Sequence, residues 1–161
     1  MERKKKYGPI KNPHELKSSG IIGSLLRLFY YSFDYIFGYV IKVYPVIVKK
    51  SSIWIFDRYY YDYMIDPKRA RLSLPSWIIN SMNLLIPKPD LILCFGANPK
   101  VIFDRKPELP LAEIEKQVNK LRIFAKNNNN AVWIDTEKSI EESTNEAFIT
   151  ILEKMSNRYK S

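Results

Sequence analysis

The 161-residue sequence contains little glycine, cysteine and histidine. Its five glycines fall below the average share of about 7%, and none of them stands in a GxxxxGK[ST] or GxGxxG pattern. One cysteine and one histidine exclude an internal disulfide and a Cys/His metal cluster. The sequence therefore contains no glycine-rich phosphate loop. A single thiol, Cys94, fits the reducing cytoplasm, where we expect the protein to reside.

The sequence also lacks a hydrophobic run long enough to cross a membrane. Its most apolar region, residues 21–48, is interrupted by Arg27, Asp34 and Lys42, whereas a membrane span needs about 20 predominantly apolar residues. The basic residues that open the chain are not followed by the apolar stretch of a signal peptide. We expect no membrane partner.

Positive charge is in excess, and it is unevenly distributed. Of the net charge of +9, residues 1–90 contribute +8, from 15 basic and 7 acidic residues, and residues 91–161 contribute +1, from 11 and 10. This asymmetry favours an anionic partner for the first half, whether nucleotide phosphate, nucleic acid or a membrane surface. Residues 1–18 form a basic arm without the interleaved aromatic side chains of a nucleic-acid site, so we expect no nucleic-acid partner.

The hydrophobic pattern of residues 19–161 predicts an α/β domain, a parallel sheet flanked by helices. A long helix is predicted from Ile21 to about Tyr44, with a thin polar stripe opposite its apolar residues. Short apolar runs predict buried parallel strands at 53–56, 91–95 and 131–134. Further helices are predicted over 75–86, 99–106, 110–126 and 136–157, the last one capped by Thr136.

Ligands of such a fold bind beyond the carboxyl ends of the strands. The predicted strands place Asp57-Arg58, Phe95-Gly96 and Asp135 along one edge of the sheet. This edge is where we expect the functional site.

The stretch from Asp57 to Arg71 is the richest in chemistry. Arg58 offers a planar fork for an acceptor phosphate, and Asp57 offers a carboxylate that could orient hydrated Mg²⁺. Tyr59 and Tyr60 could line a pocket for a base or sugar, with Arg69 and Arg71 adding charge. Structural ion pairs and packed tyrosines are the alternative interpretation, and the pattern alone favours them.

A second basic motif lies near residue 105. Arg105 and Lys106 end a short predicted helix just before a loop bracketed by prolines. Arg105 could lie over the phosphates of a nucleotide or stack on its base. The alternative is a helix C-terminus stabilised by cations, and the motif taken alone favours it.

The order of these pieces resembles the thymidylate kinase-like group of P-loop nucleoside monophosphate kinases. The resemblance runs from about residue 19 to 155 and rests on six pieces of the sequence, each of moderate specificity. They are the long aromatic helix, the 53–59 stretch, Asp66-Pro67-Lys68-Arg69, the segment from Pro87 to Leu91, and the segments 99–109 and 131–135.

The resemblance implies transfer of the γ-phosphoryl group of ATP to a nucleoside monophosphate, with Mg²⁺ and ATP as cofactors. Asp57-Arg58-Tyr59 matches the family's Asp-Arg-aromatic motif, in which the Asp serves the magnesium region and the Arg binds the acceptor phosphate. Arg105 matches the arginine that precedes the lid and meets the donor nucleotide. The resemblance also implies a three-layer α/β/α arrangement, and it reverses the preference for structural ion pairs at Asp57-Arg58.

Two parts of the family pattern are absent from the sequence. The first strand, phosphate loop and following helix are expected before residue 19, and residues 116–119 contain no second lid arginine. We therefore expect the chain to hold the acceptor and lid half of a kinase. Losing a central strand leaves unpaired backbone groups, so we expect low stability, a homo-oligomer or a complementing N-terminal segment.

Two other functions are compatible with the sequence. One is a catalytically inactive kinase-like fragment or interaction protein, which the missing loop favours. The other is a peripheral membrane protein that binds through the aromatic helix and the basic arm, although the polar face of that helix carries few cations.

Overall fold

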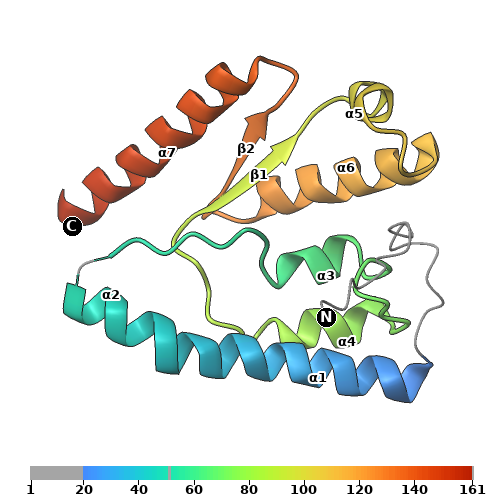
Figure 1. Cartoon of the computed structure of the whole chain (residues 1–161), viewed down its shortest axis with the longest axis horizontal. Coiled ribbons are helices and arrows are strands. Elements are labelled where there is room, and N and C mark those ends of the chain that lie inside the picture. Colours follow the sequence, from blue (N-terminus) through green and yellow to red (C-terminus); the bar gives the residue numbers. More distant parts are fainter. Residues whose placement is uncertain (1–19, 51, 161) are drawn as a thin grey trace, which may run out of the picture. The chain divides into compact units, whose positions relative to one another are not determined.

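The computed structural model describes residues 20–50 and 52–160, with side chains described as far as Asn157. The chain divides into two compact units, one ending at Pro87 and the other beginning at Lys88. Its described residues form six helices, counting 21–50 as one, and a two-stranded parallel sheet flanked by helices (Figure 1). The chain is thus a mixed α/β protein. The basic arm predicted over residues 1–18 lies outside the described residues.

The first unit contains a helix of 30 residues. It comprises α1 (Ile21–Gly38), a single π-helical turn η2 (Tyr39–Val43) and α2 (Tyr44–Lys50). The predicted helix is confirmed and continues six residues beyond its predicted end. Because the helix has no break, it presents two long faces, one toward the core of its unit and one away from it.

The core of the first unit forms between this helix and two short ones, α3 (Tyr61–Ile65) and α4 (Ser76–Met82). Its buried residues are Leu28, Tyr60, Leu72, Ile79 and Ile86. Helix α4 ends earlier than predicted, and α3 was not predicted from the sequence.

The long helix faces the core through one row of buried side chains, two serines with a leucine between them. Ser24, Leu28 and Ser32 are buried at four-residue spacing. The Ser24 hydroxyl oxygen accepts a hydrogen bond of 3.0 Å from the Ser73 backbone N–H, and Arg27 donates from Nη1 to the Ala70 carbonyl at 3.2 Å. Part of the predicted polar stripe therefore faces the core, because Ser24 and Arg27 hydrogen-bond to backbone groups there.

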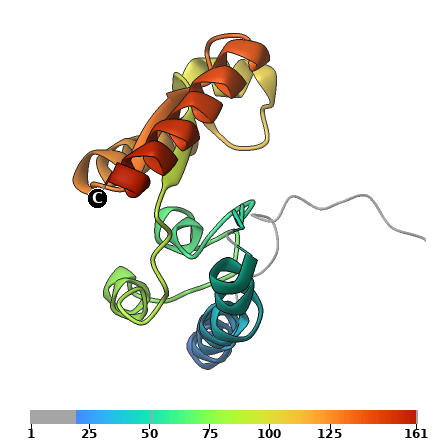
Figure 2. The same ribbon diagram turned by 90° about the vertical axis from the view of Figure 1, so that its left-hand side faces the viewer.

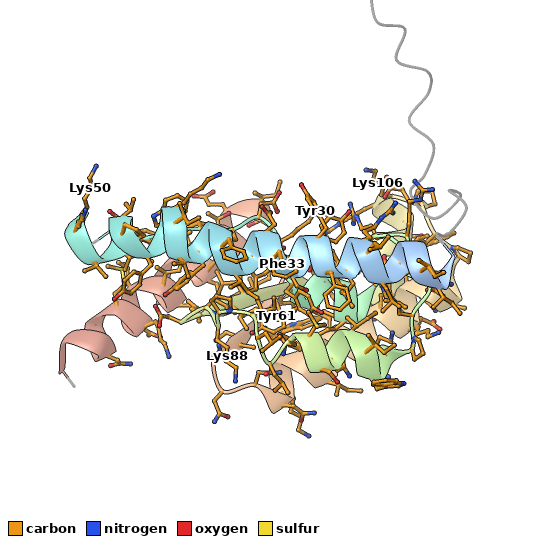
Figure 3. The ribbon with its side chains drawn as sticks, turned by 90° about the horizontal axis from the view of Figure 1, so that it is seen from below. Tyr30, Phe33, Lys50, Tyr61, Lys88 and Lys106 are labelled. Carbon is orange, nitrogen blue, oxygen red and sulfur yellow. The ribbon has the colours of Figure 1, made fainter. Side chains whose placement is uncertain are left out.

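The opposite face of the helix carries an exposed apolar stripe. The residues of this stripe are each between 47% and 76% exposed: Ile22, Leu26, Phe29, Tyr30, Phe33, Phe37, Val40, Ile41, Tyr44 and Val48. Figure 3 shows the helix from this side, with Tyr30 and Phe33 labelled along it and Lys50 near its end. Of the helices within the described ranges, none combines the length and apolar character that crossing a membrane requires.

Residues 53–56 do not form the predicted strand. The segment is extended, and its four large side chains are exposed, Ile55 to 81%. The sheet described in the structure contains only β1 and β2, both in the second unit. An apolar run becomes a strand only when another strand pairs with its backbone, and this segment has none in the sheet. Asp57-Arg58 therefore does not end a strand.

The second unit contains the sheet. Strands β1 (Ile92–Gly96) and β2 (Ala131–Asp135) pair in parallel, with Ile92 opposite Ala131 and Gly96 opposite Asp135. The strands predicted at 91–95 and 131–134 are confirmed to within one residue. The crossover between them contains α5 (Pro99–Arg105) and α6 (Leu111–Asn127), and α7 (Ile140–Lys160) follows β2. Figures 1 and 2 show the two strands between α6 and α7.

The last helix begins later than predicted, and Ser139 caps it in place of Thr136. The Ser139 hydroxyl oxygen accepts from the Glu142 N–H at 3.1 Å, and the Glu142 carboxylate accepts from the Ser139 N–H at 3.0 Å. These reciprocal bonds form a capping box. The Ser139 hydroxyl also donates to the Glu142 carboxylate at 2.8 Å. This bond and the one from the Ser139 N–H lower the pKa of Glu142, because they stabilise its ionised form.

Gly96, the last residue of β1, lies directly against the indole ring of Trp133. A Cβ atom at position 96 would lie 2.2 Å from Trp133 Cη2. Arg122 lies over the same indole, with its guanidinium carbon 4.8 Å from the ring centroid. Glycine is therefore required here by close approach.

We expect Gly96→Ala to lower the free energy of unfolding of the second unit by about 1–3 kcal/mol, because the indole must be displaced. Urea unfolding followed by circular dichroism measures this. Gly20→Ala is the matched control, since no atom of the surrounding structure lies within 4 Å of a Cβ built there and its φ of −57° suits alanine. Equal midpoints for the Gly96 variant and the unmodified chain would contradict the packing argument.

Candidate functional site

A pocket of about 520 Å³ lies in the second unit, next to the carboxyl ends of β1 and β2. It is lined by residues from the end of β1, the end of α5, the loop after β2 and the first turns of α7: Phe95, Arg105, Thr136, Lys138, Ser139, Ile140, Ser143 and Thr144. This is the edge of a parallel sheet at which ligands of α/β proteins bind, and the volume is in the range of small-molecule sites.

Backbone hydrogen bonds hold the loop after β2 against the end of β1. The Thr136 N–H donates to the Gly96 carbonyl at 2.9 Å. The Glu137 side chain accepts from the Asn98 N–H at 2.6 Å, and its own N–H donates to the Asp135 carboxylate at 2.9 Å. The loop is thus fixed to both strand ends, so the pocket has a defined wall.

Arg105, the predicted donor-nucleotide residue, lines this pocket. Its Nη1 donates to the Thr136 carbonyl at 2.7 Å, which ties the end of α5 to the loop after β2. A guanidinium has five N–H donors, and this bond orients the group toward the loop. The side chain is exposed, so its other N–H groups can donate to further oxygen atoms.

Lys138 brings a second cation to the pocket, and sequence reasoning missed it. Its Nζ lies 2.9 Å from the carboxylate of Glu146, in the second turn of α7. Hydrogen bonding and charge attraction from Glu146 raise the pKa of Lys138. The Lys138 side chain therefore stays charged over the physiological range. Its place in the loop after β2 could have been found from the strand-edge rule that located Asp135.

The pocket combines positive charge with hydroxyl and apolar groups. Ser139, Ser143 and Thr144 supply hydroxyl oxygens, and each hydroxyl already donates a hydrogen bond, to the Glu142 carboxylate, the Asp135 carbonyl and the Ile140 carbonyl. Phe95 and Ile140, which are 52% and 88% exposed, supply apolar surface. Cations beside a flat apolar wall suit a ligand with phosphate and a planar base.

The first unit contains the Asp57-Arg58 motif, with both side chains exposed. Asp62, which sequence reasoning did not select, is the half-buried member of this group. Burial raises the pKa of Asp62 above its usual value, whereas Arg58 and then Arg69 act to lower it. The structure therefore brings Asp57, Arg58 and Arg69 into electrostatic range of one carboxyl group. The four-residue spacing from Arg58 to Asp62 was the available signal.

Arg58 and Arg71 both have backbone conformations in the left-handed region, with φ of 85° and 57°. For a residue with a Cβ this conformation costs about 1–2 kcal/mol. At Arg71 the N–H donates to the Lys68 carbonyl at 2.8 Å and closes a turn. At Arg58 the strain lies within the motif that the sequence selected, where strained backbone is frequent at functional sites.

Tyr59 and Tyr60 are packed side chains with engaged hydroxyls. Tyr60 is fully buried in the core and donates to the Ile79 carbonyl at 2.8 Å. Tyr59 is partly buried and donates to the Pro87 carbonyl. Burial raises the pKa of each to about 12. Both tyrosines therefore stabilise the first unit through packing and a hydrogen bond.

Among the described residues no group of three or more His, Cys, Asp or Glu side chains is placed to hold a metal ion. Mg²⁺ commonly takes only one or two protein carboxylates, with its other ligands from water and phosphate. Asp57 offers a single exposed carboxylate.

Comparisons with protein-family models, with curated proteins and with solved structures found no match to this chain.

The buried tyrosines predict a pH dependence of stability. Above pH 10, where free tyrosine ionises, the unfolded chain releases protons that the folded chain keeps up to about pH 12. The free energy of unfolding therefore falls over this interval, by up to about 1.4 kcal/mol per pH unit for each such tyrosine. Urea unfolding at several pH values measures the slope.

Tyr60→Phe tests this assignment. The variant should lose about 1 kcal/mol at neutral pH, because the Ile79 carbonyl loses its donor, and it should also show a shallower alkaline slope. A slope identical to that of the unmodified chain would show that Tyr60 does not keep its proton in the folded state.

Proposed function

We propose that this chain binds nucleotides and is the acceptor and lid half of a thymidylate kinase-like phosphotransferase, which passes the γ-phosphoryl group of ATP to a nucleoside monophosphate. The observation that carries the proposal is the pocket beside the ends of β1 and β2, with Arg105 and Lys138 among its lining residues. A nucleotide needs cations for its phosphates and a flat apolar surface for its base, and the pocket offers both.

In this proposal the pocket takes ATP, the donor nucleotide. Arg105 would hold phosphate oxygens through its remaining N–H groups while the Thr136 carbonyl keeps the guanidinium in place. Lys138 would add a second point charge, and Phe95 would offer a ring face to the base. Mg²⁺ enters the proposal only with the ATP phosphates, which normally supply several of its ligands.

The proposed acceptor side uses the first unit. Arg58 would bind the phosphate of the nucleoside monophosphate, with Arg69 adding positive charge near the same carboxyl group. The strained backbone at Arg58 and the partly buried Asp62 support this assignment, because both are features frequent at functional sites.

A second candidate is a nucleotide-binding protein that transfers no phosphate. The observation that favours it is the absence of GxxxxGK[ST] from the 161 residues. The two candidates share the pocket and differ in turnover. Release of ADP from ATP in the presence of a nucleoside monophosphate and Mg²⁺ separates them.

We expect calorimetric titration to detect ATP binding, and Arg105→Ala to weaken it about tenfold or more, which corresponds to about 1.4 kcal/mol. Lys138→Ala should act in the same direction. Glu146→Gln should strengthen binding, because it releases Lys138 from its ion pair.

Lys154→Ala is the matched control for these variants. Lys154 is an exposed cation of α7. It lies 14 residues, or about 21 Å, beyond Ile140, so its loss should leave ATP binding unchanged. The proposal fails if neither ATP nor any nucleoside monophosphate binds and the Arg58→Ala variant binds them no differently from the unmodified chain. Equal losses in the Lys154 and Arg105 variants would indicate a diffuse charge effect instead of a pocket.

A further inference from the structure

The exposed apolar stripe on the long helix is the largest feature of the first unit that the proposed function leaves unexplained. Its ten side chains, at about 100 Å² for each half-exposed aromatic or large aliphatic residue, amount to roughly 1,000 Å² of apolar surface. Single exposed apolar residues are ordinary, but contiguous patches of this size mark interaction surfaces. A stable protein interface buries about 800 Å² on each partner, so this one face is large enough.

The charges beside the stripe are arranged symmetrically about Gly38. Asp34 lies four residues before it and Lys42 four residues after it, and both side chains are exposed. Neither forms an ion pair among those given for the described residues. The π turn over residues 39–43 has more residues per turn than an α-helix, so it offsets the drift of four-residue steps and keeps the three positions in one row.

Gly38 itself has open space around it. No atom of the surrounding structure lies within 4 Å of a Cβ built at this position. Glycine in a helix interior costs about 1 kcal/mol relative to alanine, and nothing in the first unit requires its small size. A glycine beside an exposed apolar stripe allows another backbone to approach closely.

We infer that the stripe is the interface of a homodimer in which the long helices of two copies pack antiparallel, with a two-fold axis at Gly38. In such a pair the residue n positions before Gly38 lies opposite the residue n positions after it on the partner. Asp34 of each copy therefore faces Lys42 of the other, twice. The inference does not depend on nucleotide binding.

The charge pattern selects a second copy over other occupants. An antiparallel pair separates Lys49 and Lys50 of the two copies, which a parallel pair would bring together. Arg27, on the same flank, is directed to the Ala70 carbonyl of its own unit. A lipid surface would be favoured by basic residues alone and would leave Asp34 without a partner.

Charge reversal tests this geometry directly. The dimer dissociation constant is measured by sedimentation equilibrium, with circular dichroism to establish that each variant is folded. Asp34→Lys and Lys42→Asp should each weaken the dimer at least about tenfold, because like charges then face each other. The double variant Asp34→Lys/Lys42→Asp should return it to near the original value. Positions 34 and 42 are two turns apart in one helix, so this rescue requires a partner chain.

Asp34→Lys/Lys50→Asp is the matched control, with the same net charge as the rescued variant and no expected rescue, because position 50 lies opposite Leu26 of the partner. A disulfide gives a second readout that needs no charge change. Gly38→Cys should form a covalent dimer under oxidising conditions. Tyr30→Cys should not, since the two positions 30 would lie about 24 Å apart, and a disulfide needs Cα atoms within about 7 Å.

Three results would overturn the inference. The chain could remain monomeric at every concentration, or it could dimerise with no response to either charge reversal. It could also stay monomeric and bind vesicles of anionic phospholipid but not of zwitterionic phospholipid, which would assign the stripe to a membrane surface.

Discussion

Parallel pairing of β1 with β2 determines where chemistry can occur in the second unit. The register brings Gly96 and Asp135 side by side, so the segments that follow both strands leave from the same edge. Hydrogen bonds from Thr136 and Asn98 then close the two segments on each other. The pairing also needs Gly96, because the Trp133 ring occupies the space of a side chain there. The pocket is thus a consequence of strand register, and its cations come from segments that the register positions.

The first unit depends on a different constraint, the choice of helix face. A row of small residues with Ser24 and Ser32 meets the core, while the aromatic residues lie on the other side. The core still forms, because Tyr60 is buried with its hydroxyl bonded and Leu28 packs against it. At about 25 cal/mol per Å², burying the exposed apolar stripe would yield on the order of 25 kcal/mol of hydrophobic free energy, which the unit by itself does not gain. That burial remains for an interface.

The elements that were predictable from sequence are those fixed by local pattern. Strands 91–95 and 131–134 and the helices between and after them follow from short apolar runs and helical spacing, and the structure contains them. Residues 53–56 show the same strand pattern but stay unpaired, because pairing depends on another strand and not on the run itself. The sequence also did not indicate which face of the long helix meets the core, because apolar residues occupy most of its circumference. The Ser139–Glu142 capping box could be predicted from the three-residue spacing of its members. A role for Lys138 is indicated only by its place in the same pocket as Arg105.

Arg105 and Lys138 already bind groups of the protein, the Thr136 carbonyl and the Glu146 carboxylate. These contacts would change the affinity of the proposed site for a phosphate without blocking it. The Lys138–Glu146 pair is exposed, and such pairs contribute only about 0–1 kcal/mol. A doubly charged phosphate group can therefore displace Glu146 at small cost. Arg105 gives one of its five N–H groups to the Thr136 carbonyl and keeps the others. This bond limits the rotamers of a long side chain, so less conformational entropy is lost when an anion binds. In the proposed site the Thr136 carbonyl would thus hold the guanidinium in place for an anion, and the exposed Glu146 carboxylate would give way to a phosphate at small cost.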